Sequence, residues 1–141
     1  MIKLVYTETK GKLFSTNDYY VYCINAKLEY VDILSKQIDN KFKIKNIIEK
    51  KYLNNVKVGH AILYGKLFSL IIKDEYKDTP RYTNLNKALI EMKQLCIKFD
   101  IKKIIIPKLG EKFYDLDYIN VKDNIIKVFN DLDIEIIMME V

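Results

Sequence analysis

The chain has 141 residues, a length that suits one domain with a single core, and we expect residues 1–141 to form it. Half of the residues are apolar, and only four are glycine and two proline, which argues against a disordered segment. The 24 basic and 19 acidic residues leave a net charge of +5. Because the lysines are scattered, this charge only weakly favours phosphate-bearing partners, nucleic acid among them.

Other classes are excluded by the apolar runs and the cysteines. The longest apolar runs are too short to span a bilayer, and the first ten residues lack the apolar core of a secretory signal. Cys23 and Cys96 show no CxxC or Cys/His spacing, which argues against a structural zinc site and for two reduced core thiols. We therefore expect a cytoplasmic protein that has no membrane partner, no bound metal and no cofactor.

The first half of the chain predicts two strands and then two helices. Residues 2–8 alternate like a half-buried strand, and residues 19–24 are apolar enough for a central strand. The spacing predicts a helix for residues 31–42 and a second, short helix over residues 45–53. The apolar positions that recur at helical spacing in the first of these helices are Val31, Leu34, Ile38 and Phe42.

The middle of the chain reads as a β-hairpin followed by a long helix. Residues 58–73 contain two strands joined by a tight turn at Tyr64-Gly65, where glycine supplies a positive φ angle. Residues 83–99 carry apolar side chains at the i, i+3, i+4, i+7 spacing of an amphipathic helix.

The last third predicts a buried strand at 102–107, a helix around 121–129 and a closing strand at 134–139. Strands that alternate with crossover helices imply a three-layer α/β/α domain with a central mixed sheet. In such folds ligands bind beyond the carboxyl ends of the strands. The loops after Ile24, Lys73 and Pro107 should therefore lie together.

Residues 70–110 resemble the macro domain family, above all its branch of terminal ADP-ribose protein glycohydrolases. The branch has a strand ending in lysine, a Pro-x-Tyr-x-Asn-Leu segment, an amphipathic helix, and a strand ending in Pro-(Lys/Arg)-(Ile/Leu)-Gly. Residues 128–141 match the last helix and strand of the family, and the likeness is looser before residue 60. The matching positions are Lys73, Pro80, Tyr82, Asn84, Leu85, Pro107, Lys108, Leu109 and Gly110.

The resemblance implies ADP-ribose or a chemical relative as ligand, but the first family motifs are altered. The family has a Gly-Ala-Gly turn whose amides approach the diphosphate, whereas this chain has no glycine between Gly11 and Gly59. The family's Lys-Gly-Asp, whose aspartate accepts a hydrogen bond from adenine, reads Lys10-Gly11-Lys12. An ammonium cannot accept that bond.

The second phosphate loop is altered as well. Gly110 remains, Lys112 replaces the second glycine, and Tyr114 stands where the family has a catalytic aspartate. Asp115 lies one residue after the position of the family's catalytic aspartate, so it is a candidate acid/base. The simpler role is charge complementarity at the amino end of the following helix. Lys73 matches the catalytic lysine of the branch, which attacks the anomeric carbon. The alternative is that Lys73 is an ordinary solvated lysine at a strand end.

The remaining candidates would bind the ligand without reacting. Asn25 faces the distal ribose or serves as a turn residue. Phe113 and Tyr114 form a stacking platform or pack on the core. Lys12, Lys108 and Lys112 would fringe the cleft with positive charge. The full ligand-binding set is Gly11, Lys12, Asn25, Lys108, Gly110, Lys112, Phe113 and Tyr114, beside the catalytic candidates Lys73 and Asp115.

The leading hypothesis is a degenerate macro domain that binds an ADP-ribose-related or other phosphorylated nucleotide ligand without efficient turnover. Such a protein reads an ADP-ribosylated macromolecule or sequesters an NAD-derived signal. The enzyme alternative is an ADP-ribosyl glycohydrolase that uses Lys73 as nucleophile and Asp115 as acid/base. A third alternative is a non-catalytic protein-interaction module whose cleft is filled by side chains.

Overall fold

The computed structural model describes residues 3–109 and 112–141, except for the side chain of Lys112. The helices and strands follow the predicted order along the chain, except for two short strands within residues 112–117 that were not predicted. They are β1 (Val5–Lys10), β2 (Tyr19–Asn25), α1 (Ile33–Phe42), α2 (Ile44–Lys51), β3 (Ala61–Tyr64), β4 (Leu67–Lys73), α3 (Tyr82–Lys98), β5 (Lys103–Lys108), β6 (Lys112–Phe113), β7 (Leu116–Asp117), α4 (Tyr118–Phe129) and β8 (Glu135–Glu140), with a 3₁₀ turn at Leu53–Asn55.

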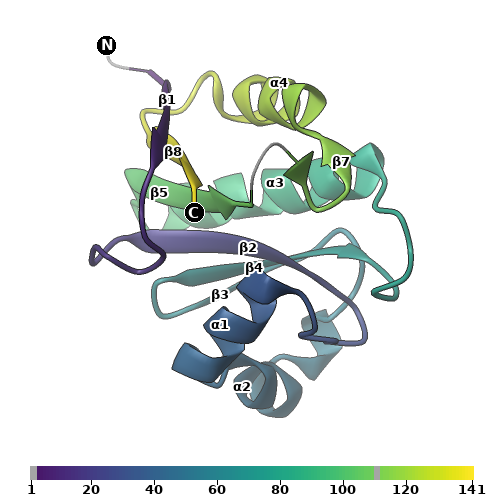
Figure 1. Cartoon of the computed structure of the whole chain (residues 1–141). Coiled ribbons are helices and arrows are strands. Elements are labelled where there is room, and N and C mark those ends of the chain that lie inside the picture. Colours follow the sequence, from purple (N-terminus) through teal and green to yellow (C-terminus); the bar gives the residue numbers. More distant parts are fainter. Residues whose placement is uncertain (1–2, 110–111) are drawn as a thin grey trace.

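One six-stranded sheet has the order β1-β8-β5-β2-β4-β3 (Figure 1). Its neighbours are parallel except for the β3–β4 hairpin, which confirms the predicted mixed sheet. Gly65 turns this hairpin with a φ of +57°, as the sequence predicted. Because β2, β4 and β5 are parallel, their carboxyl ends lie at the same edge of the sheet.

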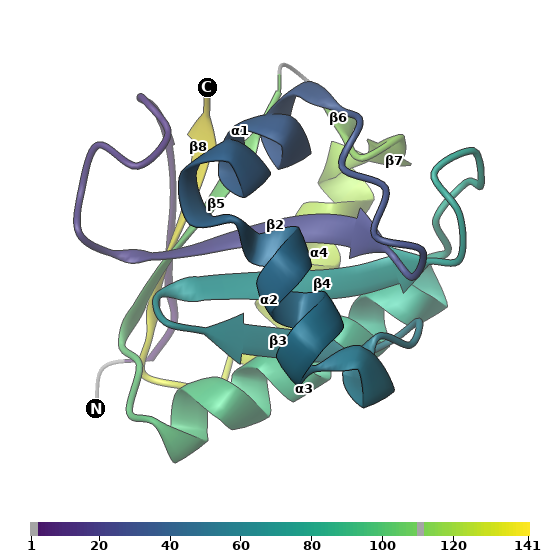
Figure 2. The same cartoon turned by 90° about the horizontal axis from the view of Figure 1, so that it is seen from below.

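Helices cover both faces of the sheet, which confirms the three-layer prediction. In Figures 1 and 2, α3 and α4 lie on one face and α1 and α2 on the other. The central strand β2 shows why, since its side chains alternate between the two cores. Val21 and Cys23 pack with α3 and α4, whereas Tyr22 and Ile24 pack with α1 and α2.

A small hairpin between β5 and α4 was missed by the sequence reading. Strands β6 and β7 pair antiparallel, and the turn between them places Tyr114 at φ +52° and Asp115 at φ +66°. Strands of two residues are too short to show periodicity. Two successive non-glycine residues at positive φ are also uncommon, so the sequence carries no turn signal here.

Two further features can be stated for the residues that the structure describes. None of their helices is long and apolar enough to cross a membrane. Their His, Cys, Asp and Glu side chains form no group of three that could hold a metal ion.

Candidate functional site

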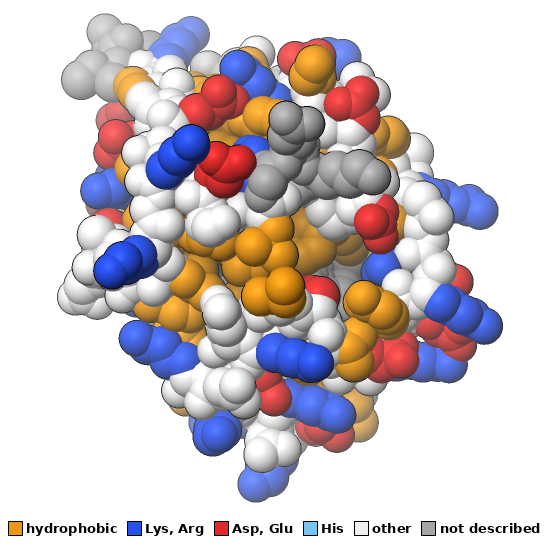
Figure 3. Space-filling view, viewed as in Figure 1, with side chains coloured by type: hydrophobic (Ala, Val, Ile, Leu, Met, Phe, Trp, Pro, Cys, Tyr) orange, Lys and Arg blue, Asp and Glu red, His pale blue; other side chains and the backbone are white. Residues whose placement is uncertain are grey.

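A cleft of about 230 Å³ opens at the carboxyl ends of β2, β4 and β5. The loops after these three strands line it together, which confirms the predicted meeting of the three loops. Figure 3 shows hydrophobic side chains gathered at the centre of this face, with charged side chains around them. The lining residues are Cys23, Ile24, Asn25, Asp32, Leu34, Ile72, Lys73, Tyr76, Lys108, Leu109, Phe113, Tyr114 and Asp115.

Most of the predicted site residues lie in this cleft. Both catalytic candidates line it, and so do four of the ligand-binding candidates: Asn25, Lys108, Phe113 and Tyr114. Gly110 and the side chain of Lys112 lie outside the described residues.

Gly11 and Lys12 follow β1 and do not line the cleft. The Gly11 amide donates to the carbonyl of Glu140 at 3.0 Å, and a Cβ at this position would lie 2.7 Å from the sulfur of Met139. The side chain of Met139 in β8 approaches so closely that packing explains the glycine at this position. Lys12 is exposed.

The ammonium of Lys73 is held by the loop that follows its own strand. Nζ donates to the main-chain carbonyls of Tyr76 at 2.6 Å and Asp78 at 3.0 Å. It also lies 5.1 Å from the centroid of the Tyr76 ring, a cation–π distance. To act as a nucleophile, this amine would first have to release both carbonyls.

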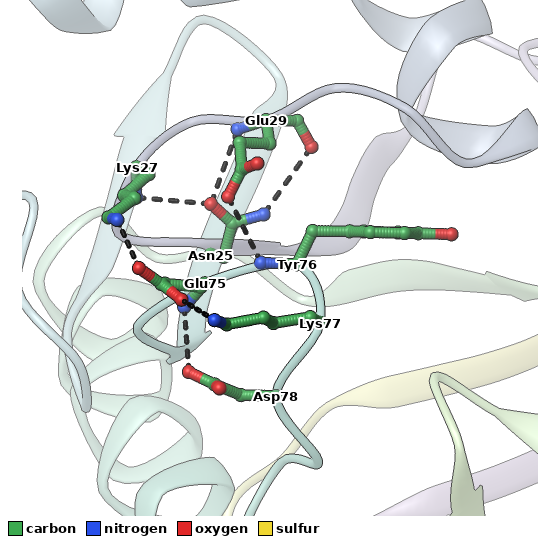
Figure 4. Close-up of polar contacts among 7 residues, drawn as sticks. All are labelled: Asn25, Lys27, Glu29, Glu75, Tyr76, Lys77 and Asp78. Atoms are coloured by element: carbon green, nitrogen blue, oxygen red, sulfur yellow. Dashed lines mark hydrogen bonds and ion pairs between the residues drawn. The ribbon is translucent and has the colours of Figure 1, made fainter.

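The same loop is tied to the loop after β2 by polar contacts (Figure 4). Lys27 forms an ion pair with Glu75, which also pairs with Lys77 at 3.3 Å. The hydrogen bond from Lys27, followed by that from Lys77, lowers the pKa of the Glu75 carboxyl. In turn, the hydrogen bond and charge of Glu75 raise the pKa of the Lys27 ammonium. The Tyr76 amide donates to the Glu29 carboxylate at 3.1 Å. Two walls of the cleft are thereby fixed to each other.

Asn25 uses its side chain to shape its own loop. Its oxygen accepts from the amides of Lys27 at 3.0 Å and Glu29 at 3.2 Å, and its nitrogen donates to the Glu29 carbonyl at 3.4 Å. The residue is only 1% exposed. Of the two roles that the sequence left open, contact with the distal ribose or a turn residue, this geometry corresponds to the turn residue.

Asp32 lines the cleft and was missed as a site residue. It is the N-cap of α1, and its carboxylate accepts from the amide of Ser35 at 2.9 Å. An aspartate just before an apolar periodic segment is a known N-cap signal, and the helix follows a strand that ends at the predicted site. These two facts together could have placed Asp32 in the cleft.

Phe113 and Tyr114 line the cleft from the hairpin of β6 and β7. Phe113 is 2% exposed, and the two rings meet edge to face at 4.8 Å between centroids, so Phe113 packs in the core instead of presenting a stacking face. Burial, with smaller contributions from neighbouring charges including Asp32, raises the pKa of the Tyr114 hydroxyl well above its usual value.

The Tyr114 hydroxyl oxygen is enclosed and has no hydrogen-bond partner among the described residues. The backbone of Cys23 lies near the hydroxyl and favours its ionised form, but the two groups do not have the geometry of a hydrogen bond. An enclosed hydroxyl without a hydrogen-bond partner costs folding free energy. In a cleft, such a group points to a functional role.

The acidic pair before α4 divides into two roles. Asp117 is the N-cap of α4, where its carboxylate accepts from the Ile119 amide at 3.1 Å. Asp115 is exposed and lines the cleft. The capping role therefore falls on Asp117, and Asp115 remains the candidate acid/base.

Lys108 lines both the cleft and a second cavity of about 270 Å³. Its ammonium lies 4.8 Å from the centroid of the Tyr118 ring. The Tyr118 hydroxyl donates to the carboxylate of Glu8 and is bonded to the hydroxyl of Tyr6. The second cavity is lined by Glu8, Thr9, Lys10, Lys108, Tyr118, Met138 and Glu140.

Comparison with known proteins agrees with this fold. Over 137 residues the chain is 30% identical to the ADP-ribose glycohydrolase OARD1 of Bos taurus and 29% identical to that of Homo sapiens; each match covers 92% of this chain and 88% of the relative. No family model matches the sequence. The chain belongs to the macro domain family, close to the terminal ADP-ribose glycohydrolases.

Solved structures support the same assignment of the fold. The macrodomain of Thermus aquaticus DarG matches with a TM-score of 0.83 at 16% identity, over 98% of this chain and 99% of that one. Thermosipho africanus DarTG in complex with ADP-ribose matches with a TM-score of 0.71 at 12% identity, over 86% of this chain and 37% of that one.

Proposed function

We propose that this macro domain binds an ADP-ribose-related or other phosphorylated nucleotide ligand and does not turn it over efficiently. In this role it is a pseudoenzyme that reads an ADP-ribosylated macromolecule or sequesters an NAD-derived signal. The observation that carries the proposal concerns Lys73, which lines the cleft but whose ammonium donates to two main-chain carbonyls.

The chemistry of glycoside cleavage explains why this arrangement favours binding over turnover. A lysine nucleophile must be deprotonated and must reach the anomeric carbon, and a second group must supply or remove a proton. Here the amine is engaged by Tyr76 and Asp78, and an enclosed phenol stands at position 114. Burial raises the pKa of this phenol, so it stays protonated and neither accepts nor readily releases a proton.

Ligand binding is supported by the open cleft and by the relatives. The described residues leave about 230 Å³ beside four charged side chains, so the cleft is not filled as an interaction module would require. Two curated relatives are ADP-ribose glycohydrolases, and one solved neighbour was determined in complex with ADP-ribose. The interaction module is therefore the weakest of the three candidates.

One observation favours the glycohydrolase alternative. Lys73 and Asp115 line the same cleft, as a nucleophile and an acid/base would have to. In that case Lys73 would leave the Tyr76 and Asp78 carbonyls when substrate binds.

Calorimetry with ADP-ribose, followed by single-turnover release of ADP-ribose from a mono-ADP-ribosylated protein, tests the proposal. We expect measurable binding, together with a release rate that is equally slow in the wild type and in Lys73→Ala. Fast release that Lys73→Ala abolishes would establish the glycohydrolase instead. Absence of binding by the wild-type protein would leave the interaction module.

A further inference from the structure

The amino end of α1 faces the cleft and is already occupied by an anion. The carboxylate of Asp32 accepts from the amide of Ser35 at 2.9 Å, and the Asp32 carbonyl accepts from the amide of Lys36 at 3.0 Å. Asp32 and Leu34, on either side of the first helical residue, both line the cleft. The helix end that borders the ligand space thus carries its own negative charge.

A helix N-terminus is ordinarily an attractive site for phosphate, because its unpaired amides and its dipole both favour negative charge. A carboxylate at that end satisfies the amide and cancels the positive end of the dipole. A phosphate brought to the same place meets a like charge instead of a positive potential.

The charge of Asp32 extends into the cleft. It contributes to raising the pKa of the Cys23 thiol and of the Tyr114 hydroxyl, in both cases after burial, which is the larger cause. Both of these residues line the cleft. Among the residues that the structure describes, the other charged side chains that line it are those of Lys73, Lys108 and Asp115. These residues give the cleft two carboxylates and two ammonium groups, with no excess of positive charge among them.

We infer that Asp32 is a specificity-determining residue that keeps phosphate groups away from the α1 end of the cleft. This inference rests on the proposed function only in placing the ligand in this cleft. The end of the cleft beside α1 then takes an uncharged part of a ligand, and any phosphate lies toward the ammonium of Lys108. Weak binding of a diphosphate is the expected consequence.

The substitution Asp32→Asn removes the negative charge and keeps the capping structure of the helix. Asparagine is as good an N-cap as aspartate and retains the acceptor for the Ser35 amide, so the helix should remain intact. The matched control is Asp39→Asn. The Asp39 carboxylate accepts from the Lys45 amide at 2.9 Å, near the opposite end of α1, and Asp39 lines neither cavity.

The probes are inorganic pyrophosphate, ADP-ribose and uncharged adenosine, each titrated calorimetrically into the wild type and the two variants. Removal of one like charge from the helix end should raise the affinity for pyrophosphate and for ADP-ribose about tenfold in Asp32→Asn. Adenosine affinity should not change, and Asp39→Asn should behave like the wild type.

The inference is overturned if Asp32→Asn gains no affinity for pyrophosphate or ADP-ribose. It is also overturned if Asp39→Asn gains as much, since the cause would then be net charge, or if adenosine gains equally, since the cause would then be space. A wild type that binds no ADP-ribose, beside an Asp32→Asn variant that gains pyrophosphate affinity, would sink the proposed function and sustain this inference.

Discussion

The ammonium of Lys73 donates a hydrogen bond to the main-chain carbonyl of Tyr76 at 2.6 Å and lies 5.1 Å from the centroid of the same residue's ring. One strand-end lysine thus holds both the backbone and the side chain of a residue in the following loop. The Tyr76 side chain is 46% exposed, and the residue lines the cleft. Lys73 is in this way part of the wall of the cleft as well as a candidate for chemistry.

Replacing Lys73 with methionine keeps the apolar stem and removes the ammonium. We expect the amides of residues 74–78 to exchange hydrogen about tenfold faster, because the carbonyls of Tyr76 and Asp78 lose their shared donor. Hydrogen exchange followed by mass spectrometry measures this. Lys77→Met is the matched control, since its side chain is 80% exposed and pairs only at the surface with Glu75. Unchanged exchange in Lys73→Met would show that the loop is fixed by its contacts to the β2 loop alone.

Removing the hydroxyl of Tyr114 should not destabilise the protein. The oxygen is enclosed without a partner among the described residues, so Tyr114→Phe removes a desolvation cost and should leave the free energy of unfolding equal or raise it by up to about 1 kcal/mol. Urea denaturation followed by circular dichroism gives this value. A loss of more than about 1 kcal/mol would mean that the hydroxyl is hydrogen-bonded in solution.

Tyr22 provides the opposite case in the same protein. Its buried hydroxyl accepts from the Ser69 hydroxyl at 2.7 Å and is bonded to the Tyr30 hydroxyl at 2.7 Å. Tyr22→Phe leaves Ser69 buried without this partner, and we expect a loss of about 1–3 kcal/mol in the free energy of unfolding. The same denaturation series measures both phenylalanine variants. Equal stability of the two would contradict the assignment of these hydrogen bonds.

The alkaline limb of stability should depend on Tyr6. Burial raises the pKa of its hydroxyl from 10.0 to about 12. Because the folded state holds this proton more tightly than the unfolded state, the hydroxyl contributes stability fully below pH 10. That contribution is lost as the pH rises from 10 to about 12. Unfolding free energies of Tyr6→Phe should therefore fall less steeply over this window than those of the wild type. Parallel curves would contradict the prediction.

The order of the elements was predictable because each long element has its own periodicity. Helix α3 has apolar residues at i, i+3, i+4 and i+7, and β5 contains an uninterrupted apolar run at 104–107, so neither needs tertiary contacts to be identified. The parallel arrangement then follows from the alternation of strands and helices. Placement of Lys73, Asn25 and Lys108 in one cleft follows in turn, since all three lie at or next to the carboxyl end of a strand.

The sequence by itself determined the layers, the edge of the sheet that carries the cleft, and which family glycines and acids are missing. The partners of those residues were decided only by the tertiary structure. Lys73 is bonded to main-chain carbonyls, which no side-chain pattern encodes, and Tyr114 is aimed by two successive positive φ angles without glycine. Periodicity reports which face of an element is buried, whereas the direction of a loop side chain depends on backbone angles that distant contacts impose.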